Sequence, residues 1–285
     1  MKVINNIKNC KTAMEKLENK GFSVGFVPTM GSFHEGHLNL IRKAVEECDR
    51  VVVSIFVNPT QFGPDEDLEK YPRNFRRDRL LAEEEGVDYV FHPDVEEMYP
   101  PGNRTWVDVS GLSSIMCGKF RPGHFRGVAT VVLKLFNIIN PERAYFGEKD
   151  YQQMVIVKRM VKDLNLDIKI AGCPTVREKD GLAMSSRNKY LSKRERREAV
   201  ILYECIKMSE KMVLKGEKDL NKIKRKAERR LKDSRFVKKI DYFDFRDPLT
   251  LGKKKKVRSG DKNILAAAAV WVGSIRLIDN MVIKL

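Results

Sequence analysis

In the first 175 residues, short apolar runs typical of strands are followed by segments with the apolar spacing of helices. Short apolar runs with the composition of buried strands occur at residues 24–27, 51–57, 87–91, 145–146 and 168–176. Between the first two runs, Leu38, Ile41 and Val45 recur at helical spacing, which predicts a helix that begins near Gly36. Strands that alternate with helices favour a parallel sheet that helices cover on both faces.

Helical spacing of apolar residues also predicts helices at residues 75–85, 128–139 and 154–164. After residue 175 the pattern changes, and two basic helices are predicted at residues 193–214 and 220–232. Late strands are predicted at residues 242–245, 264–272, 274–278 and 281–283, the last two as a hairpin around Asp279-Asn280. We therefore predict an α/β protein with a Rossmann-like parallel sheet in an N-terminal domain, residues 1–175, and a smaller α+β C-terminal domain, residues 176–285.

The net charge of +16 supports the same division. Acidic and basic residues are equal in number in residues 1–175, so the whole positive excess lies in residues 176–285. Such an excess can serve nucleic acid or an anionic substrate, or can form a solvated surface. We favour the solvated surface, because the basic residues lie opposite the apolar stripes of the two late helices. No nucleic-acid partner is therefore expected.

Composition also bears on the compartment. No apolar run approaches the ~20 residues that a membrane span needs, and residues 1–20 are charged and amphipathic rather than a signal peptide. The five cysteines are scattered and include no Cys-x-x-Cys pair, which favours reduced thiols in small buried positions over disulfides or a zinc site. We expect a cytoplasmic protein with no membrane partner.

The candidate chemistry centres on the turn after the first apolar run. Pro28 and Gly31 are expected to end that strand, and the turn then delivers His34 and His37 to the start of the following helix. The chain contains only four histidines, and these two lie three residues apart, on one face of a first helical turn. Unpaired backbone N–H groups and the helix dipole favour an anion there. The sequence predicts a phosphate site at this turn.

Polar residues also follow two other predicted elements of the first domain. Asn58 and Gln61 come directly after the strand at residues 51–57, and in an open α/β sheet the loops at the carboxyl ends of the strands form the ligand site. Taken alone, Gln61 could equally lie in a solvated turn. Arg121 and His124 stand at the start of the helix at residues 128–139, where a cation could receive a carboxylate.

Two further turns carry charge. Lys149 and Asp150 follow the strand at residues 145–146, although a plain charged turn would explain this pair by itself. The loop at residues 180–188 combines Ser185, Ser186 and Arg187 with the flexible Gly181. Hydroxyls and an arginine on a flexible loop are suited to contact phosphate and to close over a nucleotide.

Together these segments resemble the pantoate–β-alanine ligase family, the pantothenate synthetases, within the HIGH-motif nucleotidyltransferase superfamily. The blocks that carry the resemblance are residues 28–31, 34–37, 56–62, 121–127, 147–153 and 184–188, in the family's order. The segment Met184-Ser185-Ser186-Arg187-Asn188 takes the place of the superfamily's Lys-Met-Ser-Lys-Ser loop without its first and last lysines, and Arg187 supplies the charge. Ser32-Phe33 departs from the family's more frequent residues, which we expect to affect packing rather than chemistry.

The resemblance implies an AMP-forming ligase. Such an enzyme condenses (R)-pantoate with β-alanine, using ATP and Mg²⁺, through a pantoyl adenylate, and releases AMP and pyrophosphate. It also implies a homodimer, catalytic roles for His34, His37, Lys149 and Arg187, and a C-terminal domain that acts as a lid. The implied ATP-binding residues are Met30, Gly31, Ser32, Phe33, His34, Glu35, Gly36, His37, Gly147, Glu148, Lys149, Asp150, Val176, Met184, Ser185, Ser186 and Arg187. The implied substrate residues are Gln61 and Gln153 for pantoate, with Asn58, Arg121 and His124 nearby, and Mg²⁺ is expected to bind mainly through the ATP phosphates.

Two other kinds of protein would also fit part of this sequence. Another HIGH-motif nucleotidyltransferase, one that makes a dinucleotide or a CDP-alcohol, would share the phosphate residues but not the pair Gln61 and Gln153. A basic nucleic-acid-binding protein without enzymatic activity would use the positive C-terminal part, although its lysine-rich helices lack interleaved aromatic residues.

Overall fold

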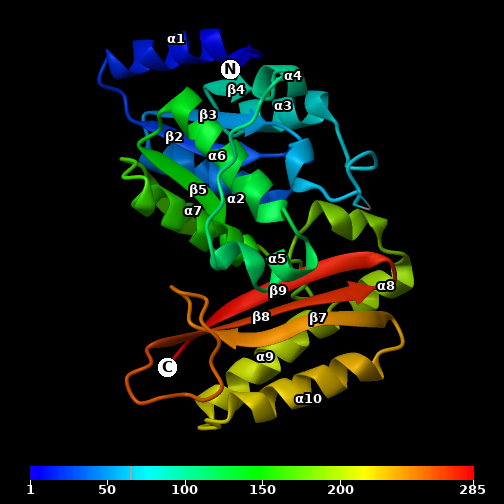
Figure 1. Ribbon diagram of the computed structural model, residues 1–285. Helices are drawn as coiled ribbons and strands as arrows, with labels where there is room; N and C mark the ends of the chain where they lie inside the picture. Colours follow the sequence, from blue (N-terminus) through cyan, green and yellow to red (C-terminus); the bar gives the residue numbers. More distant parts are fainter. Residues whose placement is uncertain (65) are drawn as a thin grey trace. The chain divides into compact units, whose positions relative to one another are not determined.

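The computed structural model describes residues 1–64 and 66–285 and contains two compact units (Figure 1). The first unit comprises Met1–Glu148 and Gln153–Pro174, and the second comprises Lys149–Gln152 and Thr175–Leu285. The short segment Lys149–Gln152 is thus grouped with the C-terminal part of the chain, although it follows a strand of the first unit. Each unit is described here by itself.

A six-stranded sheet forms the centre of the first unit. In spatial order its strands are β1 (Lys2–Ile4), β4 (Tyr89–Phe91), β3 (Arg50–Ile55), β2 (Val24–Thr29), β5 (Arg143–Gly147) and β6 (Lys169–Cys173), and every adjacent pair is parallel. The predicted parallel sheet is confirmed. Strand β1 was not predicted, because three residues are too few to show a period.

Helices cover both faces of this sheet. The main ones are α1 (Ile7–Glu18), α2 (Glu35–Glu47), α3 (Phe75–Glu84), α6 (His124–Ile139) and α7 (Tyr151–Asp163), with short helical turns at α4 (Val95–Met98), η1 (Pro59–Gln61), η2 (Leu112–Ser114), α5 (Cys117–Phe120) and η3 (Glu148–Asp150). Neighbouring residues of β2 point to opposite faces. Val27 joins the core cluster that contains residues of α2, whereas the ring of Phe26 packs edge-on against Phe136 of α6.

Two predicted boundaries in this unit are wrong. Strand β2 does not end before Pro28 but continues through it, with Pro28 paired to Ser54 of β3. Strand β5 pairs only with Gly25 and Phe26, so Pro28 stands beyond that ladder, where no hydrogen bond is required of its missing N–H. Helix α6 begins at His124 rather than near Val128, because Gly123 adopts the left-handed conformation that starts it.

The strand order reverses at β2, which has β3 on one side and β5 on the other. Open α/β sheets bind ligands outside the carboxyl ends of their strands at such a switch point. The turn that leads from β2 to His34 and the end of β5 at Gly147 both lie at this edge. The fold therefore places the predicted chemistry where this class of sheet uses it.

The second unit contains an antiparallel sheet and three helices. Its elements are η4 (Ser186–Tyr190), α8 (Lys193–Glu198), α9 (Ile201–Leu214), α10 (Leu220–Asp233), β7 (Val237–Arg246), β8 (Asn263–Val272) and β9 (Ile275–Lys284), with β8 in the centre of the sheet. The single helix predicted at residues 193–214 is two helices. Residues 199 and 200 keep helix-like φ angles of −59° and −61° and form a turn between the two helices.

The predicted hairpin around Asp279-Asn280 is also wrong. Strand β9 is continuous from Ile275 to Lys284, and Asp279 and Asn280 pair with Ala268 and Ala267 of β8. The turn lies earlier, where Gly273 has a φ of +57°. Asp and Asn are rare inside strands, but here both side chains have specific partners within the second unit, which are described below.

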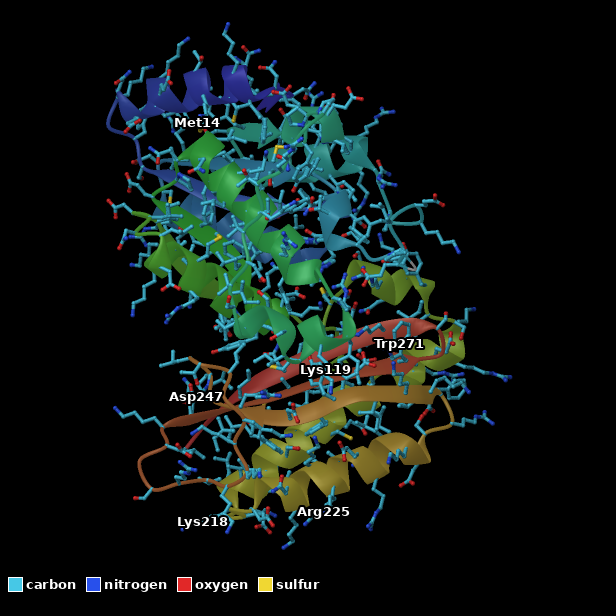
Figure 2. All side chains as sticks on the ribbon, in the orientation of Figure 1. Met14, Lys119, Lys218, Arg225, Asp247 and Trp271 are labelled. Atoms are coloured by element: carbon cyan, nitrogen blue, oxygen red, sulfur yellow. The ribbon has the colours of Figure 1, made fainter. Side chains whose placement is uncertain are left out.

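Most basic residues of α10 lie on its exposed side, while Lys224 is partly buried and donates to Asp244 of β7. Leu220, Ile223, Ala227 and Leu231 form the buried stripe of this helix. Arg225 is exposed and points away from the sheet of its own unit in Figure 2. The interpretation of this charge as a solvated surface stays a prediction.

The cysteines occupy small positions in the packing. All five belong to the described part of the chain and none forms a disulfide; four are buried, and Cys48 is partly exposed. Burial raises the pKa of Cys10 to about 12 and the pKa values of Cys173 and Cys205 to about 11. Among the described residues, no helix has both the length and the apolar character that crossing a bilayer demands.

Candidate active site

The turn between β2 and α2 is held by side chains that accept hydrogen bonds from its backbone. The N–H of Gly31 donates to Thr29 Oγ1 over 3.1 Å. The N–H groups of Ser32 and Phe33 donate to the two carboxylate oxygens of Asp78, over 2.7 and 2.8 Å. A buried carboxylate from α3 therefore binds two backbone N–H groups of the turn that precedes α2.

His34 and His37 form a reciprocal cap at the start of α2. The N–H of Gly36 donates to His34 Nδ1 over 3.1 Å, and the N–H of His34 donates to His37 Nδ1 over 3.4 Å. The two rings lie with their centroids 4.2 Å apart. A ring nitrogen that accepts an N–H carries no proton, so in each neutral ring the proton is on Nε2. Both histidines are thereby prepared as hydrogen-bond donors through Nε2.

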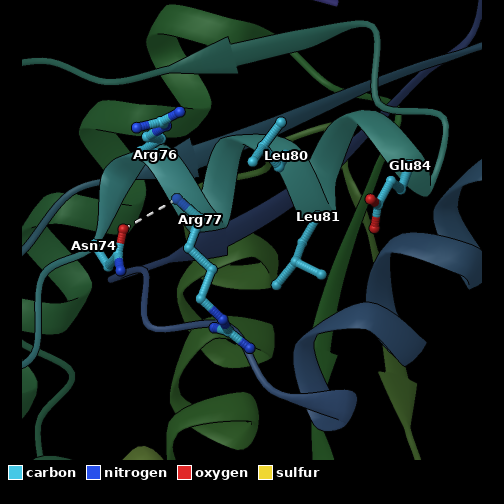
Figure 3. A pocket seen from close by; sticks show the side chains of 6 residues that line it. All are labelled: Asn74, Arg76, Arg77, Leu80, Leu81 and Glu84. Carbon is cyan, nitrogen blue, oxygen red and sulfur yellow. Dashed lines mark hydrogen bonds between the residues drawn. The ribbon is translucent and has the colours of Figure 1, made fainter.

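Helix α3 contacts the same turn with a second residue. Arg77 Nη1 donates to the carbonyl of Phe33 over 2.9 Å, and the N–H of Arg77 donates to the capping Asn74 over 3.0 Å. Figure 3 shows the long Arg77 side chain leaving the helix. A cavity of about 350 Å³ lies along this helix and is lined by Asn74, Arg76, Arg77, Leu80, Leu81 and Glu84. Of its lining residues, Arg77 contacts the turn.

Gln61 lies at the end of η1 and is connected to the turn. Its Nε2 donates to Met30 Sδ over 3.1 Å, and its Oε1 accepts from Asn58 Nδ2 over the same distance. Asn58 also donates to the carbonyl of Gly127 and accepts from Tyr99. Asn58 is 1 % exposed, and its amide is occupied by these contacts. The structure thus brings Met30, Asn58 and Gln61 together, with Asn58 orienting Gln61.

Arg121 and His124 meet beneath Gln61. Arg121 donates to Glu66 through Nε over 2.7 Å and through Nη2 over 2.5 Å. His124 Nδ1 lies 2.8 Å from the carbonyl oxygen of Gln61, so it is the donor there, and Nε2 is left to accept from Arg121 Nη1 at 3.0 Å. Burial raises the pKa of Glu66, but the hydrogen bonds and charge of Arg121 outweigh this and hold that pKa below its usual value. A substrate carboxylate would have to replace Glu66 at Arg121.

Gly127 allows η1 to approach α6 closely. A Cβ atom at this position would lie 2.4 Å from the carbonyl oxygen of Thr60 and 2.8 Å from Cα of Gln61. Both are backbone atoms, which cannot rotate away. The glycine therefore sets the position of the turn that carries Gln61.

In the second unit, Val176 and Met184 are neighbours. The N–H of Met184 donates to the carbonyl of Val176 over 3.0 Å, and the N–H of Glu178 donates to the carbonyl of Leu182 over 2.8 Å. The segment that was predicted as a flexible loop is thus a short hairpin. It leads into η4, where Ser185 Oγ accepts from the N–H of Arg187 over 3.3 Å. Ser186 is buried, whereas Ser185 and Arg187 are partly exposed.

Lys149 is held through its backbone within the second unit. Asn280 Nδ2 donates to the carbonyl of Lys149 over 2.8 Å, and Lys149 Nζ lies 3.6 Å from a carboxylate oxygen of Asp150. The neighbouring Asp279 is paired with Arg177 through two hydrogen bonds of 2.7 and 2.9 Å. Strand β9 therefore supports both the hairpin that contains Val176 and the segment that contains Lys149.

The remaining candidates are in the first unit. Gly147 ends β5, and a Cβ atom there would meet nothing within 4 Å. Glu148 begins η3, and Gln153 is partly exposed in the first turns of α7.

Sequence reasoning missed several residues of these networks, among them Glu66, Asp78, Gly127 and Asn280. One signal was available for Asp78, because it shares a helix face with Phe75 and Ala82, where an apolar residue is expected. A charged residue on a buried stripe points to a specific partner. Glu66, Gly127 and Asn280 carried no such signal, since their partners are far away in the sequence.

The fold and these turns define a class of protein: a Rossmann-like α/β protein whose polar groups gather at the carboxyl ends of parallel strands, beside a helix capped by two histidines. The chain belongs to the pantoate-beta-alanine ligase family, whose model matches residues 2–282. It is 54 % identical to a pantothenate synthetase of Caldicellulosiruptor bescii over 284 residues, 100 % of this chain and 99 % of that protein. It is 55 % identical to one of Thermotoga petrophila, over 99 % of this chain and 100 % of that one.

Solved structures of the same family also match this chain. The pantothenate synthetase of Thermus thermophilus matches with a TM-score of 0.93 and 43 % identity, covering 100 % of both chains. The pantoate-beta-alanine ligase of Francisella tularensis, complexed with beta-gamma ATP and beta-alanine, matches with a TM-score of 0.78 and 37 % identity, covering 99 % of this chain and 97 % of that one. The family membership expected from the sequence is confirmed, and so is the fold.

Proposed function

We propose that this protein condenses (R)-pantoate with β-alanine at the expense of ATP. Family membership over nearly the whole chain is the observation that carries the proposal. A carboxylate oxygen of pantoate attacks the α-phosphorus of ATP, pyrophosphate leaves, and a pantoyl adenylate forms. The amine of β-alanine then attacks the acyl carbon, loses a proton, and expels AMP to give pantothenate.

The phosphate part of this reaction is assigned to His34, His37, Lys149 and Arg187. Attack at phosphorus concentrates negative charge on the phosphate oxygens, and donors placed in advance stabilise that charge. The two histidines are suited to this as neutral donors through Nε2, since each Nδ1 already accepts a backbone N–H. Lys149 and Arg187 supply positive charge. No general base is needed for adenylation, because pantoate arrives ionised.

The other ATP contacts are proposed from the family resemblance. They are Met30, Gly31, Ser32, Phe33, Glu35, Gly36, Gly147, Glu148, Asp150, Val176, Met184, Ser185 and Ser186. Since Asp78 occupies the N–H groups of Ser32 and Phe33, we assign contacts there to side chains and carbonyls rather than to these two N–H groups.

Pantoate is assigned to Gln61 and Gln153. Neutral amides can orient a diol and a carbonyl without a charge that would trap the adenylate. Asn58 is proposed to act on pantoate through Gln61, because its own amide is occupied. Arg121 and His124 are proposed for the β-alanine step, in which the substrate carboxylate takes the position of Glu66.

Mg²⁺ is proposed to enter as part of the MgATP substrate. Among the described residues there is no group of three or more His, Cys, Asp or Glu side chains that could hold a metal ion. Mg²⁺ often binds through substrate phosphates with only one or two carboxylates, so this chain fits an ion that ATP brings with it.

Three further properties are proposed from the resemblance. They are a homodimer, a cytoplasmic location, which the use of ATP supports, and a lid role for residues 176–285. Sedimentation of the purified protein tests the dimer.

The decisive experiment incubates the protein with MgATP, pantoate and β-alanine and follows pyrophosphate and AMP separately. We expect pyrophosphate release that depends on pantoate, and AMP release that depends on β-alanine. Pyrophosphate release with a nucleotide or a phospho-alcohol in place of pantoate would favour another HIGH-motif nucleotidyltransferase. No turnover together with sub-micromolar, salt-dependent binding of tRNA or duplex would favour a nucleic-acid protein.

A further inference from the structure

We propose that Asp78 is a positioning residue for adenylation, which fixes the shape of the turn between β2 and the capping histidines. The proposal rests on the proposed function for its catalytic consequence, and on geometry alone for the shape of the turn. Asp78 is assigned no contact with ATP or pantoate. It acts through the backbone of Ser32 and Phe33.

The contacts of Asp78 are directed at this turn. Its side chain, in the first turn of α3, is 1 % exposed although it is a carboxylate. Each of its two oxygens accepts one N–H from two successive residues, at 2.7 and 2.8 Å. The nearest cation, Arg77, lies 3.8 Å from one of these oxygens. Burying a carboxylate is costly unless hydrogen bonds compensate it, so the backbone of the turn is its main partner.

The backbone that Asp78 holds is in an unusual conformation. Gly31 and Ser32 both have positive φ angles, +76° and +54°, which direct the next N–H groups towards the same oxygen pair. Ser32 is not a glycine, so its Cβ makes this left-handed conformation unfavourable unless the surroundings stabilise it. The carboxylate supplies the stabilisation that keeps the turn in this shape.

Helix α3 holds the following peptide from its other side as well. Arg77 donates to the carbonyl of Phe33, whose N–H is bound to Asp78. The next residue is His34, the cap of α2, and His34 in turn orients His37. A displacement of this turn therefore moves both proposed phosphate donors together.

The space around the turn is as tight as its hydrogen bonding. A Cβ atom on Gly31 would lie 2.9 Å from Asp78 Oδ2. The carboxylate and the turn thus fit each other closely. Replacing Asp78 by a residue of similar size with different hydrogen-bonding groups therefore tests its hydrogen bonds while its volume is kept.

The test is Asp78→Asn, which keeps the volume but turns an NH₂ group towards one backbone N–H. We expect hydrogen exchange of the peptide that spans residues 29–36 to become about tenfold faster or more. We expect kcat for pantoate-dependent pyrophosphate release to fall about 10²-fold, with the KM for ATP changed by less than about threefold, because the donors are misplaced rather than lost. Arg79→Ala, an exposed change on the same helix, is the matched control and should leave both readouts unchanged.

The experiments distinguish a failure of the proposal for Asp78 from a failure of the proposed function. A folded Asp78→Asn protein whose kcat stays within about threefold of wild type overturns the proposal, whatever its melting temperature. If this variant does not fold, Arg77→Ala decides instead: it removes the exposed partner of the Phe33 carbonyl and should lower kcat about tenfold, whereas equality with Arg79→Ala overturns the proposal. If the wild type releases no pyrophosphate with pantoate, the proposed function fails, while exchange at residues 29–36 still tests the positioning of the turn.

Discussion

Two segments that are proposed to contact ATP obtain their shape in opposite ways. The turn after β2 is held by side chains that lie 44 to 46 residues away on α3. The segment at residues 176–188 is held by its own backbone, through hydrogen bonds from Met184 to Val176 and from Glu178 to Leu182. Residues far away in the sequence therefore determine the shape of the first segment, whereas hydrogen bonds within the segment largely determine the shape of the second.

The difference determines which substitutions should matter. The first segment should respond to changes far away in the sequence, at residues that touch no substrate. The second should tolerate most such changes, apart from those at its few partners outside the segment. Arg196 pairs with Asp180 of the hairpin in a largely exposed ion pair. Arg177 contacts the carbonyl of Gly181 and also Asp279, which is 102 residues away, and this more buried ion pair anchors the hairpin.

The largest effect is expected from breaking that anchor. Arg177→Ala leaves the carboxylate of Asp279, which is 3 % exposed, without its charged partner, and should destabilise the second unit by about 3–5 kcal/mol. Urea unfolding followed by the fluorescence of Trp271, in a Trp106→Phe background, measures this. Arg230→Ala, which removes an exposed ion pair between α10 and α9 of the same unit, should cost less than about 1 kcal/mol. Equal losses in the two variants would show that the hairpin needs no anchor.

The second prediction compares the chemical contributions of the two segments. His37→Ala should lower kcat for adenylation by about 10² or more, because it removes a donor that is fixed before the substrate binds. Ser185→Ala should lower it only about tenfold, since water can replace a partly exposed hydroxyl. Single-turnover pyrophosphate release with direct ATP-binding measurements separates chemistry from affinity. A normal adenylation rate in His37→Ala would refute the role of the capping histidines.

The third prediction tests whether a residue far away in the sequence also positions Gln61, which is assigned to pantoate. Gly127→Ala forces a methyl group against the backbone of Thr60, which should cost about 1–3 kcal/mol and displace Gln61. We expect the KM for pantoate to rise about tenfold while ATP binding stays near normal. Asn137→Ala, an exposed change on the same helix, is the control. Equal losses of ATP and pantoate affinity in Gly127→Ala would mean that the two parts of the site are not independent.

The smallest expected effect concerns the pair of Glu66 and Arg121. The folded-state pKa of Glu66 lies below its ordinary value, so its stabilising contribution is present above the unfolded pKa, about 4.3, and is lost as the pH falls through the folded value. Glu66→Gln should therefore cost up to about 1 kcal/mol at neutral pH, and this cost should shrink as the pH falls through the folded-state pKa of Glu66. Urea unfolding at several pH values, with Trp106 as the probe, measures the difference. A difference that does not change with pH would contradict the ion pair.

Much of the fold was determined by the sequence alone, because its signals are local. Apolar runs and helical spacing identified five of the six strands of the parallel sheet and the helices between them, and the two histidines at the start of α2 follow from three residues of spacing. The order of secondary structure then restricts the topology, since parallel strands require crossover helices. The family resemblance likewise depended only on short contiguous blocks.

The tertiary structure decided whatever depended on distant partners. Pro28 and the pair Asp279-Asn280 carry strong local signals for breaks, yet both lie within strands, because neighbouring strands and side chains satisfy what each residue needs. In the turn before His34, a carboxylate that is 46 residues further along the chain accepts the N–H of Ser32. Which polar group a buried donor finds depends on chain packing, and no local pattern encodes it.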